Sequence, residues 1–163
     1  MKVRPGIRSD LSAILAIYNE AVLNTTASYD YEPRSMESQE YWFENHTEQG
    51  LPIFVAENWE GTVTGWSSLS RYHQRNGYRF TVENSVYVAA AHRRRGIGKL
   101  LLPPLITAAQ TLGLRAIIAA IDAENQASLR LHEGFGFEKV GHFKQVGFKF
   151  GRWLDVVYME RLI

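Results

Sequence analysis

The sequence predicts an α/β fold in which helices and strands are mixed, with a mixed central sheet of about six to seven strands and about four helices. Segments in which apolar residues recur with a helical period alternate with segments that have a strand period, from one end of the chain to the other. No linker, repeat or low-complexity tract interrupts them. The 163 residues fit one domain and can bury a full core. The composition, 45% hydrophobic and 21% charged, is ordinary for a globular protein. We therefore expect residues 1–163 to form a single domain.

The first two elements are a short strand and a helix. Residues 3–8, VRPGIR, are typical of a short or edge strand, because Pro5 and Gly6 disfavour a regular central one. Ser9 or Asp10 is then placed to cap a helix. The apolar residues that fall on one face of this helix are Leu11, Ile14, Leu15, Tyr18 and Val22.

A loop, a second helix and a hairpin follow. The polar residues 24–33 predict a loop, and Ser35 predicts the start of a helix that runs to about His46. Residues 52–57 and 63–70 have the pattern of strands, and the turn-forming stretch NWEGT between them predicts a hairpin.

The middle of the chain predicts a strand followed by a long helix. Residues 80–89 are rich in β-branched and aromatic side chains, which favours a strand. The helix after it is expected to end at Leu112, with Gly113 as its stop. Pro103 and Pro104 fall inside that helix, where proline removes a hydrogen bond and clashes with the preceding turn. We expect a kink or an early break there.

The last third of the chain predicts one more strand and helix before two final strands. Residues 115–121 are short, apolar and bounded, which indicates a buried strand. Residues 124–136 predict a helix closed by Gly134 or Gly136. The two final strands are expected at residues 137–147 and 154–163.

Charge and composition disfavour several classes of protein. Lys and Arg number 18 against 17 Asp and Glu, a net charge of +1, whereas nucleic-acid binders usually carry a strong basic field. The N-terminal MKVRPGIRSD has no apolar segment of the signal-peptide type, and no stretch approaches the roughly 20 apolar residues of a membrane span. The chain has no cysteine, which excludes disulfides and thiol nucleophiles and is compatible with a reducing cytoplasm. We expect a cytoplasmic protein without a nucleic-acid or membrane partner.

The one dense basic cluster is HRRRGIGKLL, residues 92–101. It follows a predicted strand and opens a predicted helix, so unpaired amides and the helix dipole would together make an anion site. Its spacing, Arg93-x-x-Gly96-x-Gly98, matches neither the dinucleotide-binding motif nor the Walker motif. From these residues alone, a phosphate-binding loop and a solvated basic turn both stay open.

Three segments, in the right order, resemble the GNAT family of N-acetyltransferases. The spacing R/Q-x-x-G-x-G/A between a strand and a long helix resembles the acetyl-CoA pyrophosphate loop of that family. The stretch ENQASLRLHEGFGF resembles its N-x-x-S-x-x-L-[YH]-x-x-x-GF segment. TVENSVYV, LHEGFGF and VGFKFGRWLD are similar to the phosphinothricin and methionine sulfoximine N-acetyltransferases. With AIYNEAV near the start, the resemblance covers nearly the whole chain and favours a phosphate-binding loop.

The resemblance implies that acetyl-CoA is the co-substrate. The strand backbone would meet the thioester and the pantetheine arm, the loop would hold the pyrophosphate, and the next helix would add polar contacts. The implied residues are Val86, Tyr87 and Val88 of the strand, Arg94, Arg95, Gly96, Ile97, Gly98 and Lys99 of the loop, and Asn125 and Ser128 of the helix.

The resemblance also implies the catalytic groups. Glu83 stands where the family has its catalytic base, and His132 stands where many members have a tyrosine as general acid, so the group that protonates the thiolate stays open. A carboxylate on a strand beside the thioester can take the ammonium proton, directly or through one water. Strand alternation puts Glu83, Ser85 and Tyr87 on one face, and amides near Val88 could stabilise the oxyanion. The alternative is that Glu83 is an edge charge that prevents aggregation.

The acceptor side is expected in the loop SRYHQRNGYRF, residues 70–80, and in the strand after it. Arg75 matches a carboxylate-binding arginine of the family, and a guanidinium suits bidentate capture of an α-carboxylate. The implied acceptor-side residues are Tyr29, His73, Gln74, Arg75, Glu83, Asn84 and Ser85. Without the resemblance, His73 and Arg75 would be interpreted as solvated loop residues, and Tyr29 as a packing aromatic.

The expected function is transfer of an acetyl group from acetyl-CoA to the α-amine of a small amino acid, of the methionine sulfoximine, methionine sulfone or phosphinothricin type. A polyamine or protein N-terminal acetyltransferase and a non-catalytic acetyl-CoA-binding module are the alternatives. The resemblance implies a homodimer, because residues 148–153 lie near a dimer interface in the family; the alternative is a hairpin tip. His46, His92 and His142 show no paired ligand spacing, so no metal is expected.

Overall fold

The computed structural model describes residues Met1–Ile163 and has one seven-stranded sheet at its centre. The strands are β1 (Lys2–Pro5), β2 (Ile53–Glu57), β3 (Val63–Arg71), β4 (Thr81–Val88), β5 (Ala116–Asp122), β6 (Glu138–Lys149) and β7 (Arg152–Leu162). The α-helices are α1 (Leu11–Asn24), α2 (Met36–Gln49), α3 (Ile97–Thr111) and α4 (Gln126–Glu133). Short 3-10 helices lie at Arg8–Asp10, Asn76–Tyr78 and Ala90–His92. The mixed sheet and the four α-helices confirm the predicted fold class.

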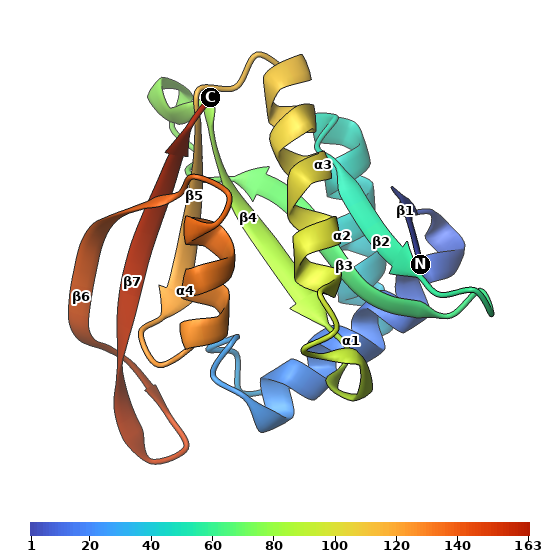
Figure 1. Ribbon diagram of the computed structural model, residues 1–163, viewed down its shortest axis with the longest axis horizontal. Coiled ribbons are helices and arrows are strands. Elements are labelled where there is room, and N and C mark those ends of the chain that lie inside the picture. The colour runs from blue at the N-terminus through green and yellow to red at the C-terminus, as the bar shows by residue number, and fades with distance from the viewer.

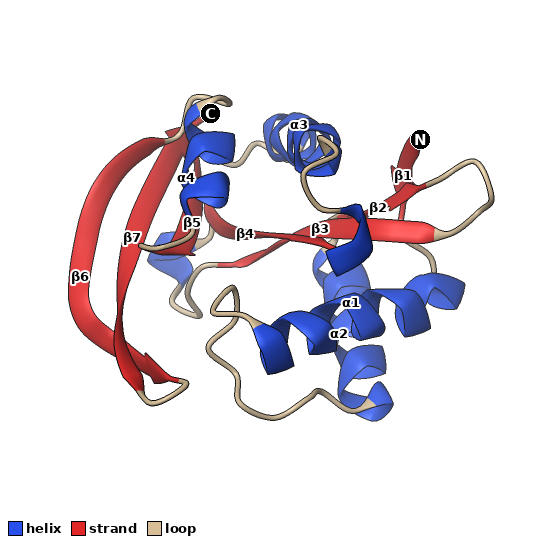
Figure 2. Ribbon diagram, turned by 60° about the horizontal axis from the view of Figure 1, so that its bottom comes forward, coloured by secondary structure: helices blue, strands red, loops and turns tan.

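The helices form one layer on each face of the sheet. Figure 2 shows α1 and α2 below the sheet and α3 and α4 above it. The apolar cluster on the α3 side includes Leu105, Ile117 and Met159, and the cluster on the α1 side includes Ile14 and Trp66. The strands β2 and β5 are therefore covered on both faces, which explains their apolar runs, whereas β6 is exposed along most of its length.

The strand order is β1-β2-β3-β4-β5-β7-β6, and every neighbouring pair is antiparallel except β4 and β5. The parallel pairing joins Thr81–Glu83 to Ala116–Ile118 and ends there. Beyond it, β4 runs on to Val88 beside β3, and β5 runs on to Asp122 beside β7. The two strands therefore separate within the sheet, and Figure 1 shows β4 and β5 diverging from each other.

Most element boundaries agree with the sequence-based predictions. Ser35 begins α2 as predicted, because its hydroxyl accepts a hydrogen bond from the amide of Ser38. The helix continues past His46 to Gln49. Gly113, with φ of 67°, follows the end of α3.

The prediction that Ser9 or Asp10 caps the first helix is wrong. Asp10 precedes α1 but has helical dihedral angles, and its side chain makes no capping bond. Its carboxylate instead accepts two hydrogen bonds from the Arg4 guanidinium, at 2.7 and 2.9 Å, and one from the amide of Ile7. Arg4 also donates to Glu57 of β2 at 2.6 Å. Asp10 therefore ties β1 to the start of α1.

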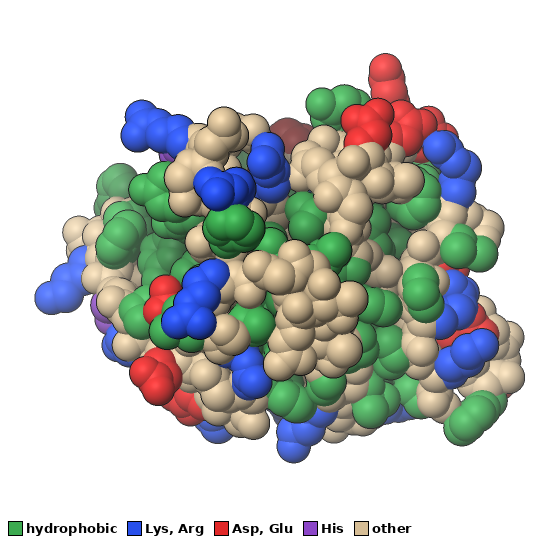
Figure 3. Space-filling model, turned by 90° about the horizontal axis from the view of Figure 1, so that it is seen from above, with side chains coloured by type: hydrophobic (Ala, Val, Ile, Leu, Met, Phe, Trp, Pro, Cys, Tyr) green, Lys and Arg blue, Asp and Glu red, His purple; other side chains and the backbone are tan.

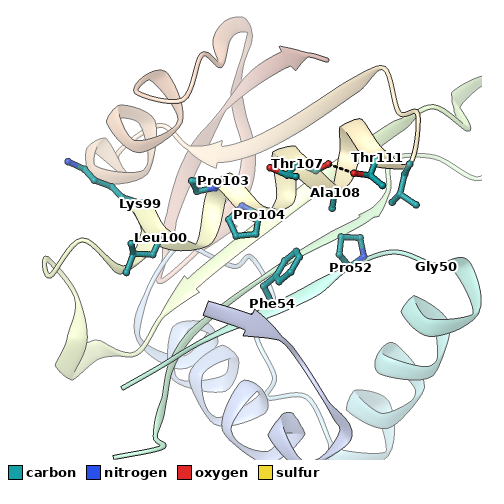
Figure 4. Close-up of a pocket in the computed structure, with 11 residues that line it drawn as sticks. Gly50, Pro52, Phe54, Lys99, Leu100, Pro103, Pro104, Thr107, Ala108 and Thr111 are labelled. Carbon is teal, nitrogen blue, oxygen red and sulfur yellow. Dashed lines mark hydrogen bonds between the residues drawn. The ribbon is translucent and has the colours of Figure 1, made fainter. Parts of the chain in front are cut away.

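Pro103 and Pro104 do not break α3, which continues to Thr111. Both rings lie on the side of α3 that lines a cavity with Phe54 of β2, the cavity shown in Figure 4. On the opposite side, Leu101, Leu102 and Leu105 are fully buried. Burial of these three side chains contributes about 1.5–3 kcal/mol each, which is enough to offset the roughly 3 kcal/mol that each of the two prolines costs in a helix interior.

The surface carries charges of both signs. Figure 3 shows basic and acidic side chains interspersed with apolar and uncharged ones over the face that it presents. None of the helices combines the length and the apolar character needed to cross a bilayer.

We predict that Asp10→Asn lowers the free energy of unfolding at pH 7 by about 1.5–3 kcal/mol, the usual contribution of hydrogen bonds to a charged group. Burial alone would raise the pKa of Asp10, but the hydrogen bonds from Arg4 and from the amide of Ile7 outweigh it and lower the pKa. A lowered pKa means that this stability is present above the unfolded-state pKa and is lost as the pH falls through the folded-state value. Urea unfolding at pH 7 and at about pH 3 should show the difference between variant and wild type shrink at the lower pH.

Candidate functional site

The candidate site lies where β4 and β5 separate. Two hollows meet there: an inner cavity of about 360 Å³ and an outer groove of about 700 Å³. The residues that line both are Thr26, Ala27, Val86, Tyr87, Asn125 and Ser128. Beyond Glu83, the edge of β4 that faces β5 has no strand partner. Backbone groups of residues 86–88 can therefore bond a ligand lying in the groove.

The basic motif forms the turn between β4 and α3. Gly96 has φ of 78° and Arg94 has φ of 63°, both in the left-handed region that glycine adopts most readily. The amides of Arg94, Arg95 and Gly96 donate to no backbone acceptor. In α3, the amides of Ile97 and Gly98 donate to no backbone acceptor either, whereas that of Lys99 donates to the carbonyl of Gly96. Together with the helix dipole, this turn provides donors and partial positive charge for an anion such as a phosphate.

The basic side chains of the motif have different positions. Arg93 donates to the carbonyl of Val88 at 3.1 Å and pairs with Glu20 of α1 at 2.5 Å, so it joins α1 to the end of β4. Arg94 lines the outer groove with Gly96, Ile97 and Gly98. Arg95 is exposed and lines neither hollow.

Lys99 lines a separate cavity of about 800 Å³ on the other side of α3, seen in Figure 4. Arg95 and Lys99 are thus the two predicted phosphate-loop residues that the structure does not bring to the groove.

Helix α4 supplies polar groups to both hollows. Asn125 caps the helix, its Oδ1 accepting from the amide of Ser128 at 3.1 Å. These two residues begin α4 directly after the loop that follows β5. The structure thus brings Asn125 and Ser128 to the position expected for contact with a groove ligand.

His132 of α4 is 3% exposed, and both of its ring nitrogens are bonded. Nδ1 lies 2.8 Å from the carbonyl of Ser128, to which it donates, and Nε2 lies 2.9 Å from Nδ2 of Asn84, from which it accepts. Burial lowers the pKa of His132, which keeps the ring neutral. Asn84 lines the inner cavity, and its buried Oδ1 has no partner. His132 therefore orients an amide whose carbonyl is available for a ligand.

Glu83 lines the inner cavity at the last paired position of β4 and β5. Burial raises its pKa above the ordinary value. Tyr158 lines the same cavity, and burial followed by the charge of Glu83 raises its pKa as well. A carboxylate with raised pKa in a cavity is well suited to accept a proton near neutral pH.

Successive side chains of β4 point to opposite faces of the sheet, as expected. Tyr87 stacks on Trp66 of the α1-side cluster at 4.9 Å, whereas Val86 packs against the α3-side cluster. Asn84 points to that second side too, since it contacts His132 of α4. Ser85 lines the inner cavity with Glu83 and Asn84.

Tyr29 lines the inner cavity and donates to Oδ2 of Asp122 at 2.8 Å. Asp122, the last residue of β5, is buried beside the cavity and was not singled out from the sequence. A signal for it exists, because ligands in α/β sheets bind at the carboxyl ends of parallel strands, where Asp122 follows an apolar run.

The loop between β3 and β4 stays outside both hollows. His73, Gln74 and Arg75 are exposed and line neither of them. The loop has its own contacts: Nδ1 of His73 accepts from the amide of Arg75 at 3.1 Å, and its ring lies 4.9 Å from that of Tyr78. The structure therefore does not bring Arg75 into the inner cavity.

No group of three or more histidine, aspartate and glutamate side chains lies together in a way that could hold a metal ion. The chemistry of the site rests on the half-buried carboxylate of Glu83, with the buried carboxylate of Asp122 beside it, on amides and hydroxyls, and on the turn at the start of α3.

Comparison with known proteins agrees with this geometry. The family model described as "Acetyltransferase (GNAT) domain" matches residues 6–158. A Pseudomonas aeruginosa protein named L-methionine sulfoximine/L-methionine sulfone acetyltransferase is 45% identical over 158 residues, which are 97% of this chain and 92% of that protein.

Two solved structures are also similar. A GNAT superfamily phosphinothricin acetyltransferase from Sinorhizobium meliloti, in complex with AcCoA, has a TM-score of 0.97 at 40% identity, with 99% of this chain and 88% of that chain covered. A ribosomal-protein-alanine N-acetyltransferase from Brucella melitensis has a TM-score of 0.97 at 43% identity, with 100% of both chains covered.

Proposed function

The chain belongs to the GNAT acetyltransferase family, and we propose that its acceptor is the α-amine of a small amino acid of the methionine sulfoximine, methionine sulfone or phosphinothricin type. It is an N-acetyltransferase that uses acetyl-CoA. The acceptor class is supported by relatives of 39–45% identity that are named for those substrates. The relative named L-amino acid N-acyltransferase, from Escherichia coli, supports a free amino acid.

The observation that carries the proposal is the position of Glu83. It stands where the strands part, in the cavity that adjoins the outer groove, and burial raises its pKa. We assign it the role of general base, which takes the proton from the acceptor ammonium, often through one water. The neutral amine then attacks the acetyl carbonyl, and amides at the unpaired edge near Val88 stabilise the oxyanion. When the tetrahedral intermediate collapses, the C–S bond breaks, and CoA leaves as a thiolate that takes up the proton lost by the attacking nitrogen.

The outer groove fits acetyl-CoA. Its end at the α3 turn offers unpaired amides and Arg94 to the pyrophosphate. Its side along β4 offers the pantetheine arm the edge of residues 86–88 that faces away from β3, apart from the Val88 carbonyl, which accepts from Arg93, in the manner of an added strand. Asn125 and Ser128 line the junction with the inner cavity, where the thioester would lie. Arg95 and Lys99 are proposed only as long-range positive charge near the phosphates.

We assign His132 a supporting role. Its Nε2 accepts from Asn84 and its Nδ1–H donates to a backbone carbonyl, so in this arrangement it has no free proton for the thiolate. It holds Asn84 with Oδ1 toward the acceptor. Tyr29 and Ser85 complete the acceptor wall.

Arg75 is proposed to bind the acceptor carboxylate, which requires its loop to move toward the inner cavity when the acceptor binds. The loop leads directly into β4, the strand that carries Glu83.

The acceptor class is tested with a panel in an acetyl-CoA turnover assay. We expect transfer to methionine sulfone, methionine sulfoximine or phosphinothricin, because the cavity of about 360 Å³ suits a free amino acid. Spermidine and a peptide with N-terminal alanine should react at least about 100-fold more slowly in kcat/KM, a difference of roughly 2.7 kcal/mol in transition-state binding. The peptide matters because one similar structure is a ribosomal-protein-alanine acetyltransferase. Faster turnover of the peptide would replace the amino-acid proposal.

We predict that Glu83→Gln lowers kcat by about 10²–10⁴-fold and leaves acetyl-CoA affinity nearly unchanged, since the amide keeps the shape but cannot accept the proton. In wild type, activity should rise with pH through the raised pKa of Glu83, because the base acts only when deprotonated. The pH–activity profile of the variant should lack this rise. Near-wild-type kcat in Glu83→Gln would mean that an already neutral amine attacks without a base.

We include a homodimer in the proposal, and a cytoplasmic location with it. The hairpin of β6 and β7 exposes a set of large apolar side chains: Val140, Phe143, Val146, Phe148, Phe150 and Trp153. Such a set is more than single proteins usually leave in water. Light scattering at micromolar concentration should give twice 18.6 kDa, and Phe148→Ser should shift the mass toward the monomer. A fully active monomer at that concentration would contradict the dimer.

A further inference from the structure

Lys149, near the end of β6, is a buried cation outside the catalytic groups. Its side chain is 3% exposed, and its Nζ donates to three backbone carbonyls: Val22 at 2.7 Å, Thr25 at 2.8 Å and Ser28 at 2.6 Å. No carboxylate lies within ion-pair distance of it. An ammonium has three donors, so each of them is used.

The three carbonyls lie at the end of α1 and in the loop after it. Val22 is in the last turn of the helix and Thr25 is its C-cap. Carbonyls at a helix C-terminus lack helical partners and carry partial negative charge, so a cation there is favourable. Burying an ammonium is costly unless such groups replace its water. Lys149 therefore keeps the backbone of residues 22–28 in one arrangement.

That backbone is a wall of the candidate site. Thr25 lines the outer groove, Ser28 lines the inner cavity, and Thr26 and Ala27 line both. Ala27 also accepts a hydrogen bond from the hydroxyl of Tyr87. A change in the path of residues 25–28 would therefore alter both hollows at once.

The hairpin contacts this loop at neighbouring positions as well. The ring of Tyr29 lies against Gly147 so closely that a Cβ there would clash with it. Tyr31 donates to the carbonyl of Phe148. On β6, Gly147 and Lys149 face the loop, whereas Phe148 between them is exposed.

We propose that Lys149 is a positioning residue for acetyl transfer, acting through the carbonyls of residues 22–28 to hold the common wall of the acetyl-CoA groove and the acceptor cavity. The inference rests on the proposed function, since it assigns those two hollows to the two substrates. Glu83 and the unpaired edge of β4 do not contact Lys149, so the chemical step itself should be spared.

The first test compares Lys149→Met with Lys144→Met, the same substitution at an exposed position of the same strand. Lys149→Met should raise the KM of acetyl-CoA and of the acceptor by about 10-fold to 100-fold, the size of effect that misplacing a binding wall produces. The kcat should stay within about 3-fold of wild type. Lys144→Met should leave all three constants unchanged. Unchanged KM values in folded Lys149→Met, assayed well below its melting temperature, would leave Lys149 a stabilising residue only and overturn the proposal.

Two readouts need no turnover. Calorimetry should show weaker binding of CoA to Lys149→Met, and hydrogen exchange should accelerate in residues 24–31 and not in β4. If wild type binds CoA but acetylates no amino acid, the acceptor proposal fails while these readouts still test Lys149. Unchanged CoA affinity and exchange would count against the positioning role.

A chemical rescue covers the case in which Lys149→Met does not fold. The chain has no cysteine, so Lys149→Cys introduces a single thiol that can be aminoethylated in denaturant before refolding. This restores an ammonium on a side chain of nearly the same length, and an ethylated sample is the neutral match. We expect the aminoethyl form to regain wild-type KM values and CoA affinity, and the ethyl form to lack them. Equal constants in both folded forms would overturn the proposal.

Discussion

The structure depends on a parallel pairing that ends after three residues. β4 and β5 pair only at Thr81–Glu83 and Ala116–Ile118, and both strands then continue with the other side still paired. Parallel neighbours need a crossover, and here α3 provides it, so α3 begins where β4 ends. In the same way α4 begins shortly after β5 ends. Both helix N-termini and an unpaired backbone edge thus meet at one opening, and no other edge of the sheet offers that combination.

Three consecutive arginines at this opening do different things. Arg93 is held by Glu20 and by the carbonyl of Val88, so its charge is largely used within the protein. Arg94 takes a left-handed backbone conformation and lines the groove, while Arg95 is exposed. The anion site therefore consists more of backbone amides than of side-chain charge. This agrees with a chain whose net charge is only +1.

Features with short-range causes could be predicted from the sequence. Ser35 caps α2 by accepting from an amide three residues on, and Gly113 follows the last turn of α3. The glycine at position 96 indicated the turn before α3. Features with long-range partners could not. Asp10 was expected to cap a helix, but its carboxylate instead accepts hydrogen bonds from Arg4. Arg4 also donates to Glu57, which is 53 residues away in the sequence.

The candidate site shows the same limit. The resemblance located Glu83, Asn125 and Ser128, which lie on regular elements with fixed neighbours. It also pointed to Arg75, whose loop the structure keeps apart from the cavity. The hydrogen bond between Tyr29 and Asp122 joins residues 93 positions apart, and Lys149 bonds carbonyls more than 120 residues away. Such pairs depend on the whole fold being in place.

The position of β7 has a consequence for the order in which the chain can fold. β7 is the last strand in the chain, yet it lies between β5 and β6 in the sheet. During synthesis, β1 to β4 can pair as soon as they leave the ribosome, whereas β5 keeps one edge open and β6 has no partner until β7 emerges. β5 is an apolar strand, and in that interval its unpaired edge can pair with another strand or another chain. A nascent chain therefore completes the β5-β7-β6 part of the sheet in one late step, and the inner cavity gains the side chains of Val156 and Tyr158 from β7 only then.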